Sequence, residues 1–242
     1  SHSRAGIRLD SLHPGLVGCS DLVAESFDPV ELAKLDAVFL AVPHGSAANL
    51  AEALDEAGAP LIIDLSNDHR HAEGWVYGLA EWSRSELSGA KRIAVPGCFA
   101  TAMSMACAPF VEKGGVVGPV RVVAATGSTG LGATAKKAGH HPERFTNMKG
   151  YKVLNHQHRP EVTTFLEGLG PFESLHFVPI SAPVDRGILA TCFLSMNEPM
   201  KPEEAMACLE QAYADEPLVR IRDVSPEIRH VRGTAYCDLG CY

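Results

Sequence analysis

Cys98 is the residue whose position most favours chemistry. It follows the apolar run Arg92–Val95 and the turn Pro96-Gly97, and the alanine- and methionine-rich stretch Phe99–Ala108 predicts a helix directly after it. The amides and dipole at the beginning of a helix stabilise a thiolate, and glycine before it lets a substrate approach the backbone. The sequence therefore predicts a nucleophilic cysteine, with a small buried residue at the start of a helix as the alternative.

A nucleophilic cysteine needs a base nearby, and His156 and His158 are the candidates. They stand in the segment His156-Gln-His-Arg-Pro-Glu161, which leads into a predicted helix with Pro160 in its first turn. Either histidine can be the base, and the nearness of Glu161, which could orient the ring, slightly favours His158. The pair could instead bind zinc, with His140 and His141 as added ligands, but we expect no metal.

Basic side chains that could bind an anionic substrate occur at three places. Lys136, Lys137 and the run His140–Arg144 form a locally basic loop, while Arg70 and Arg186 each stand close to a predicted strand. An arginine binds carboxylate or phosphate through two parallel hydrogen bonds. For each of these residues an ordinary exposed position is the alternative, and the loop suits an anionic substrate if it faces Cys98.

Strands and helices alternate through the first hundred residues. Continuous apolar runs predict buried strands. A helix capped by Asp28 precedes the first strand, and a second helix, after His44-Gly45, separates that strand from the next. The predicted order is helix 28–34, strand 37–42, helix 46–57, strand 60–64 and strand 92–95. This is the βαβ pattern of a doubly wound sheet.

The second half of the sequence has a different pattern of predicted strands and helices. It predicts strands at 121–126, 175–180 and 188–194, a glycine-rich loop at 127–132 and an amphipathic helix at 202–213, and we expect Pro109 to disturb the helix after Cys98. We therefore predict an α/β chain: a partial Rossmann-type dinucleotide-binding domain at 1–97, its first βα unit missing, and an α+β catalytic and oligomerisation domain at 98–242. The sheet of the second domain is expected to be mainly antiparallel, and the C-terminal end to return to the cofactor domain.

Composition excludes several classes of protein. The chain has 242 residues, of which 46% are hydrophobic, and a formal net charge of −8, which disfavours nucleic-acid and anionic-membrane partners. There is no apolar run long enough to span a bilayer, and we expect no signal peptide. Seven cysteines without CxxC or zinc spacing indicate thiols in a reducing cytoplasm.

One expected motif is absent. A dinucleotide-binding fold opens with a strand and a Gly-rich turn, yet no G-x-G-x-x-G follows a predicted strand near residue 1. The glycine loop 127–132 does not replace it, because no βαβ unit frames that loop. Either the cofactor site is incomplete in this chain, or the fold is not a dinucleotide binder.

At these residues the sequence resembles the N-acetyl-gamma-glutamyl-phosphate reductase family, including the related aminoadipyl-phosphate reductases of carrier-protein lysine synthesis. Each matching motif is weak alone, but they occur in the family's order over nearly the whole chain. The segments that carry the resemblance are 38–45 (VFLAVPHG), 63–70 (IDLSNDHR), 77–81 (YGLAE), 95–101 (VPGCFAT), 127–132 (GSTGLG), 151–162 and 179–188.

The resemblance implies NADPH-dependent reduction of a small anionic acyl phosphate in arginine biosynthesis, through a thioester on Cys98 with His158 or His156 as base. It also implies a homo-oligomer, either dimer or tetramer. The implied substrate-binding residues are Arg70, Ser128, Tyr151, Glu161 and Arg186. The implied cofactor-binding residues are Pro43, His44, Gly45, Ser66 and Gly130.

Three alternatives stay open at this stage. The same chemistry could act on an aminoadipyl group attached to an acidic carrier protein, which the basic loop 136–144 would fit. The chain could be a non-catalytic fragment or pseudoenzyme, or, more distantly, a zinc hydrolase. Departures from the family are Ala80, His69 and apparent truncation at both ends, from which we expect weak NADP binding.

Overall fold

The chain divides into two compact units in a computed structural model that describes residues 4–132 and 134–242. The first unit holds residues 4–78 and 83–95, and the second holds 79–82 and 96–242. Among the helices of the described residues, none is long and apolar enough to cross a membrane. Each unit is described by itself.

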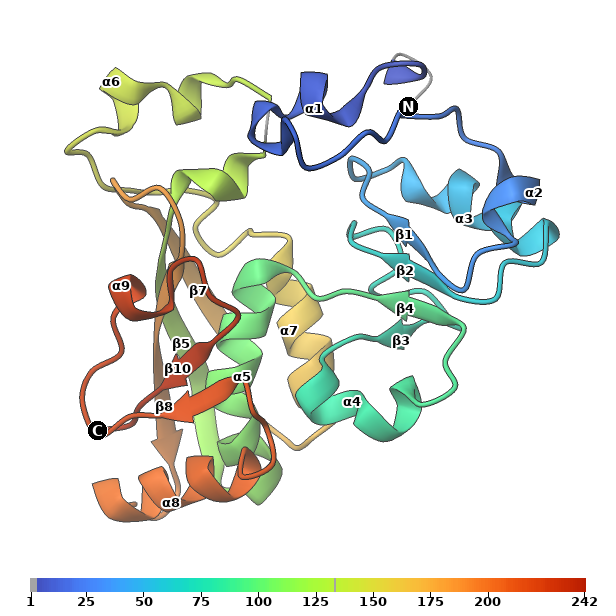
Figure 1. Cartoon of the computed structure of the whole chain (residues 1–242). Helices are drawn as coiled ribbons and strands as arrows, with labels where there is room; N and C mark the ends of the chain where they lie inside the picture. The colour runs from blue at the N-terminus through green and yellow to red at the C-terminus, as the bar shows by residue number, and fades with distance from the viewer. Residues whose placement is uncertain (1–3, 133) are drawn as a thin grey trace. The chain divides into compact units, whose positions relative to one another are not determined.

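The first unit is built on a parallel sheet with strand order β1-β2-β4-β3 (Figure 1). Its strands are β1 Val38–Leu40, β2 Ile62–Asp64, β3 Val76–Tyr77 and β4 Arg92–Ala94. Its helices are α1 Leu9–Leu12, the 3₁₀ turn Pro14–Leu16, α2 Pro29–Leu32 and α3 Ala47–Glu56, while α4 Ala80–Leu87 has a non-helical Ser83 at the boundary of the unit. All three strand pairings are parallel, so the predicted βαβ pattern is confirmed.

Helix α3 packs against this sheet through one apolar face. Ala47, Ala51 and Leu54 lie four and three residues apart and are fully or nearly fully buried, as helical spacing requires. They pack in one cluster with Leu40 and Ile62 of the strands. Complete burial of a leucine or isoleucine contributes about 1.5–3 kcal/mol each. The loops after β1 and β2 are therefore attached to a rigid base.

The second unit contains a mixed sheet with strand order β6-β7-β5-β8. Its strands are β5 Val116–Thr126, β6 Lys149–Gly150, β7 Leu175–Ser181 and β8 Ile188–Met196. The pairings β5–β8 and β6–β7 are antiparallel, as expected, whereas β7 runs parallel to β5. The chain returns from β6 to β7 through helix α7, His158–Glu167, and such a long helical connection permits a parallel neighbour.

Helix α5, Cys98–Lys113, contacts α7, β8 and β5, and Figure 1 shows it beside the sheet. The remaining elements of the unit are connected by loops. They are the 3₁₀ turns η3 Ser128–Leu131 and η4 Lys137–Gly139, helices α6 His141–Arg144, α8 Pro202–Ala212 and α9 Ile228–Val231, and the two-stranded parallel sheet of β9 Val219–Ile221 and β10 Cys237–Leu239. Strand β10 belongs to this unit, and the return of the C-terminal end to the cofactor domain stays a prediction.

Pro109 does not end helix α5, and the disturbance expected there is the loss of one helical hydrogen bond. The helix continues to Lys113, although proline has no N–H to give to the carbonyl of Met105, four residues earlier. The Tyr213 hydroxyl donates to that carbonyl at 2.6 Å and accepts from Trp82 Nε1 at 3.1 Å. A tertiary hydrogen bond thus replaces the missing helical one, and burial raises the pKa of Tyr213 far above its usual range.

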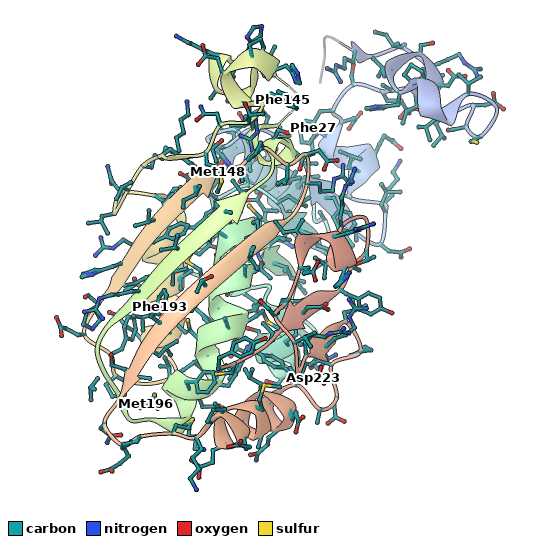
Figure 2. The ribbon with its side chains drawn as sticks, turned by 90° about the vertical axis from the view of Figure 1, so that its left-hand side faces the viewer. Phe27, Phe145, Met148, Phe193, Met196 and Asp223 are labelled. Carbon is teal, nitrogen blue, oxygen red and sulfur yellow. The ribbon has the colours of Figure 1, made fainter. Side chains whose placement is uncertain are left out.

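The face of the sheet opposite α5 is open in Figure 2, where Phe193 labels it. Side chains of β8 alternate between half-buried and exposed, and Leu189 and Phe193 are on the exposed set. Val117 and Val123 of β5 are exposed as well, and Phe193 is 57% exposed. A sheet face in contact with water is usually polar, so the apolar side chains of this face are unusual.

Candidate active site

Cys98 is the first residue of α5 and is exposed. Gly97 precedes it in an extended conformation (φ −69°, ψ 151°), which is the usual geometry of the residue before a helix. A sixteen-residue helix places its amides and positive dipole end at Cys98. The position predicted from the sequence is thus confirmed, and it favours an ionised, accessible thiol.

Glu161 fixes the turn that carries Cys98. Its carboxylate is almost fully buried at 2% exposed and accepts the Gly97 N–H at 2.8 Å. The bond joins α7 to the beginning of α5, two helices that are distant in sequence. We expected Glu161 to bind substrate, and this contact favours a positioning role for it.

His158, the first residue of α7, packs its imidazole directly on Gly97. A Cβ atom at Gly97 would collide with Nε2, Cδ2 and Cε1 of that ring. Only glycine therefore permits the histidine to lie against the residue before the nucleophile. His158 is 7% exposed and belongs to the wall of the same cavity as Cys98.

His156 has a different environment. Its Nδ1 accepts the backbone N–H of His158 at 3.2 Å, so that nitrogen is unprotonated. The ring meets Phe99, Tyr151 and Phe177 edge to face. Burial, with a smaller effect of Lys152, lowers the pKa of His156 to about 4. A histidine held neutral in this way orients its neighbours and is a poor proton carrier near neutral pH.

The low pKa of His156 predicts acid sensitivity of the fold. Unfolded chains take up a proton at this histidine near pH 6.5, whereas the folded protein takes it up only near pH 4. The free energy of unfolding should therefore fall as pH decreases between these values, by up to about 1.4 kcal/mol per pH unit. His156→Asn, which keeps an acceptor in place of Nδ1, should lose less stability over this range. Urea unfolding at pH 7 and pH 5 measures the difference, and equal losses in both proteins would contradict the assignment.

These residues line one cavity of the second unit. Cys98, Tyr151, His156, His158, Gly130 and Arg144 contribute to its wall. Tyr151 is half-buried, and burial followed by the nearby Cys98 raises the pKa of its phenol to about 12, against an opposing effect of Arg144. Tyr151 therefore stays a neutral hydrogen-bond donor beside the thiol. Gly130 was expected at the cofactor and is found in this wall.

Arg144 was considered only as part of the basic loop. It is instead buried at 8% exposed, in contrast to the exposed Lys136, Lys137, His140 and His141. Its guanidinium donates to the Ser181 hydroxyl and to the carbonyls of Thr126 and Ala182. Because backbone carbonyls have no sequence signature, no pattern in the chain indicated this burial.

Neither Ser128 nor Arg186 is among the described residues that line this cavity. The Ser128 hydroxyl lies 3.3 Å from the Val184 carbonyl and 3.4 Å from that of Asp185, which joins the glycine loop to the loop before β8. Gly127 has no room for a Cβ atom, since the backbone of Asp185 and Arg186 lies against it. Arg186 is exposed and lines a larger cleft of the same unit, whose wall also includes Cys98 and Gly130. Substrate-binding roles for both stay predictions.

In the first unit, Pro43, His44 and Gly45 are exposed after the carboxyl end of β1. Asp68 accepts the N–H groups of Gly45 and Ala47, at 2.7 and 2.9 Å. Burial opposes ionisation of Asp68, but these bonds outweigh it and lower the pKa of that carboxyl. The loop after β1 is therefore held by the loop after β2, with exposed backbone at the sheet end where α/β folds bind ligands.

A buried network continues behind these loops. Asp64, at the end of β2, accepts from the Ser66 backbone and hydroxyl and lies 2.6 Å from His69 Nδ1. His69, where the family commonly has an aromatic residue, stacks on Trp75 with ring centroids 3.9 Å apart. Ser66 is thus committed to the network, and Arg70 Nε donates to the Val95 carbonyl. These contacts fix the residues expected to bind cofactor and substrate from this unit.

His140 and His141 do not join His156 in a metal-binding group. Across the described residues, no cluster of three or more His, Cys, Asp or Glu side chains could hold a metal ion. His156 and His158 have ring centroids 4.8 Å apart and contact aromatic rings. Their surroundings are those of a hydrogen-bonded pair in an apolar pocket.

The chain is similar to known proteins both in sequence and in fold. Residues 98–242 match the family model "Semialdehyde dehydrogenase, dimerisation domain", and residues 1–90 match "Semialdehyde dehydrogenase, NAD binding domain". The N-acetyl-gamma-glutamyl-phosphate reductase of Wolinella succinogenes is 35% identical, over 99% of this chain and 75% of the relative. That of Salinispora tropica is 39% identical, over 91% of this chain and 68% of the relative. An aspartate semialdehyde dehydrogenase from Candida albicans, solved with NADP, has a similar fold, with TM-score 0.69, 16% identity, and coverage of 96% of this chain and 76% of that one.

Proposed function

Because this chain belongs to the N-acetyl-gamma-glutamyl-phosphate reductase family of semialdehyde dehydrogenases, we propose that it reduces N-acetyl-gamma-glutamyl phosphate to N-acetylglutamate semialdehyde with NADPH, releasing phosphate, in arginine biosynthesis. The relatives confirm the resemblance seen in the sequence motifs. The observation that carries the proposed chemistry is the exposed Cys98 thiol at the beginning of α5, with the His158 ring packed on the preceding glycine.

The first half of the proposed reaction is acyl transfer to Cys98. His158 takes the thiol proton, and Sγ attacks the acyl carbon of the substrate. The bond from that carbon to the phosphate oxygen breaks, and phosphate leaves with the electron pair. Amides at the beginning of α5 face the developing oxyanion, and Glu161 keeps the turn in place through Gly97. A thioester on Cys98 results.

The second half needs a reductant, and the residues of the first unit fit a dinucleotide. Pro43, His44 and Gly45 present exposed backbone after a parallel strand, and the bonds from Gly45 and Ala47 to Asp68 hold that loop. These residues would hold NADPH, which supplies hydride to the thioester carbon when bound. The proton that His158 took from the thiol passes to the resulting oxyanion, and His158 takes it back as the carbon–sulfur bond breaks, which releases aldehyde and regenerates the Cys98 thiolate.

The assay for this function follows NADPH oxidation with freshly prepared N-acetyl-gamma-glutamyl phosphate and no carrier protein. We expect acyl-phosphate-dependent oxidation with one phosphate released per NADPH consumed. The matched control is the same acyl chain as free N-acetylglutamate, which has no leaving group and should give no oxidation. Absence of turnover with the free acetylated substrate would reject this function and favour the carrier-linked aminoadipyl substrate.

We also propose that the protein is a cytoplasmic homo-oligomer, whose copies meet through the open face of the β5–β8 sheet. The match to a dimerisation domain and the exposed Val123, Leu189 and Phe193 on that face support the proposal. Burial of apolar side chains of this kind provides most of the free energy of stable oligomers. Across the described residues the cysteines form no disulfide, which supports a reducing compartment.

Phe193→Asp should reduce the oligomer to a smaller species, because it would bury a charge in an apolar interface. Sedimentation equilibrium measures the mass directly. Val30→Asp is the matched control, since Val30 is 62% exposed on α2 of the other unit and should leave the mass unchanged. An unchanged mass for Phe193→Asp would place the interface elsewhere.

A further inference from the structure

Among the residues that the structure describes, the groups that hold the buried Arg144 cation are all neutral. Its guanidinium donates to Ser181 Oγ at 2.6 Å, to the Ala182 carbonyl at 2.7 Å and to the Thr126 carbonyl at 2.8 Å. These acceptors stand at the carboxyl ends of β5 and β7, the two paired central strands. The side chain is therefore fixed in direction by the rigid part of the sheet.

The positive charge of Arg144 has no counter-ion in the part of the chain that the structure describes. No carboxylate forms an ion pair with it there, and its buried Nε has no hydrogen-bond partner. Buried charges in proteins are normally paired, because a neutral acceptor compensates only part of the lost hydration. A cation oriented so firmly and left without an anion is typical of a site whose anion arrives with the ligand.

The position of Arg144 shows which cavity such a ligand would enter. Arg144 and Cys98 both line the cavity described above, with Tyr151 and His158. Tyr151 is close enough to both for the Cys98 thiolate and the Arg144 guanidinium to act on its phenol in opposite directions. A molecule that fills this cavity would thus have one end at the nucleophile and could reach the guanidinium with another.

We propose that Arg144 binds the α-carboxylate of the acyl-phosphate substrate and so selects acyl chains that end in a carboxylate. This inference rests on the proposed function. The phosphate is attached to the carbon that Cys98 attacks, so it must leave at the Cys98 end, near the amides of α5. The α-carboxylate is at the opposite end of the glutamyl chain and needs a separate cation, which Arg144 provides.

The test compares two substrates in two proteins. N-acetyl-gamma-glutamyl phosphate has the carboxylate, and 4-acetamidobutyryl phosphate is the same molecule without it. The wild-type protein should prefer the first strongly in kcat/KM. In Arg144→Gln, kcat/KM for the first substrate should fall by roughly 10²-fold or more, mainly through KM. For the second substrate it should change little, so that the preference disappears.

Arg144→Lys and Lys137→Gln complete the design. Lysine keeps the charge but not the planar fork, so an intermediate loss of preference is expected, and this variant preserves the test if Arg144→Gln fails to fold. Lys137 is an exposed basic residue of the same loop, and its replacement should leave the preference unchanged.

Two results would overturn the proposal. An equal fall for both substrates would mean that Arg144 only holds the sheet end or serves the reaction centre. A rise in KM for inorganic phosphate in the reverse reaction, parallel to the loss with acyl phosphate, would assign Arg144 to the phosphate instead. If the wild-type protein turns over neither substrate, the proposed function fails, and that outcome differs from both.

Discussion

Replacing Cys98 with serine will stop thioester formation and lower kcat by roughly 10⁴-fold or more, the loss seen when a covalent nucleophile is removed. The serine hydroxyl is hardly ionised at neutral pH, and the amides at the beginning of α5 cannot compensate for that difference. Since the Cys98 side chain is exposed, the thermal unfolding temperature should change little. Mass spectrometry after mixing with acyl phosphate, without NADPH, measures the adduct directly.

Cys19→Ser is the control for this variant, because Cys19 is also an exposed thiol but belongs to the first unit. It should keep both the acyl adduct and the turnover of the wild-type protein. A stoichiometric release of phosphate by Cys98→Ser would show that the nucleophile is another group, and the proposed mechanism would then be wrong.

His158→Gln should lower kcat by roughly 10²–10⁴-fold, the usual contribution of a general base. The ring lies on Gly97, beside the nucleophile, and glutamine can fill that space without accepting the thiol proton. The same variant should slow alkylation of Cys98 by iodoacetamide, because fewer thiols are ionised. The alkylation rate depends on neither cofactor nor substrate and so isolates the effect on the thiol.

His156→Asn is the natural comparison, since it changes a histidine two residues away that is held neutral and accepts the His158 N–H. We expect a smaller loss of kcat than in His158→Gln and little change in the alkylation rate. If His156→Asn has the larger effect on both, the two roles must be exchanged.

Much of this arrangement could be predicted because it depends on neighbours in sequence. The strand, the Pro-Gly turn and the helix around Cys98 follow from local apolar runs and from glycine and proline, and the structure has them as predicted. The Asp28 cap of α2 follows from one side chain and the two N–H groups that it accepts. Spacing could not choose between His156 and His158, because both occur within three residues.

What the sequence did not indicate depends on partners far apart in the chain. The parallel pairing of β7 with β5 is set by the path through α7, and a strand sequence does not encode the direction of its neighbour. Arg144 was grouped with the basic loop 136–144, and its burial was not foreseen because its three acceptors, Thr126, Ser181 and Ala182, give no signal in the local pattern. Nothing in the local pattern around Glu161 indicated its bond from the Gly97 N–H, and its binding of substrate stays a prediction.

The proline within α5 has a consequence for the order of events during synthesis. The Met105 carbonyl lacks its helical donor and receives a hydrogen bond from Tyr213, a residue 108 positions later. Until that tyrosine has left the ribosome, the helix that begins at Cys98 has an unpaired carbonyl in what will become a buried turn. The reactive end of the helix can therefore form early, while its middle is completed only when most of the second unit has been made.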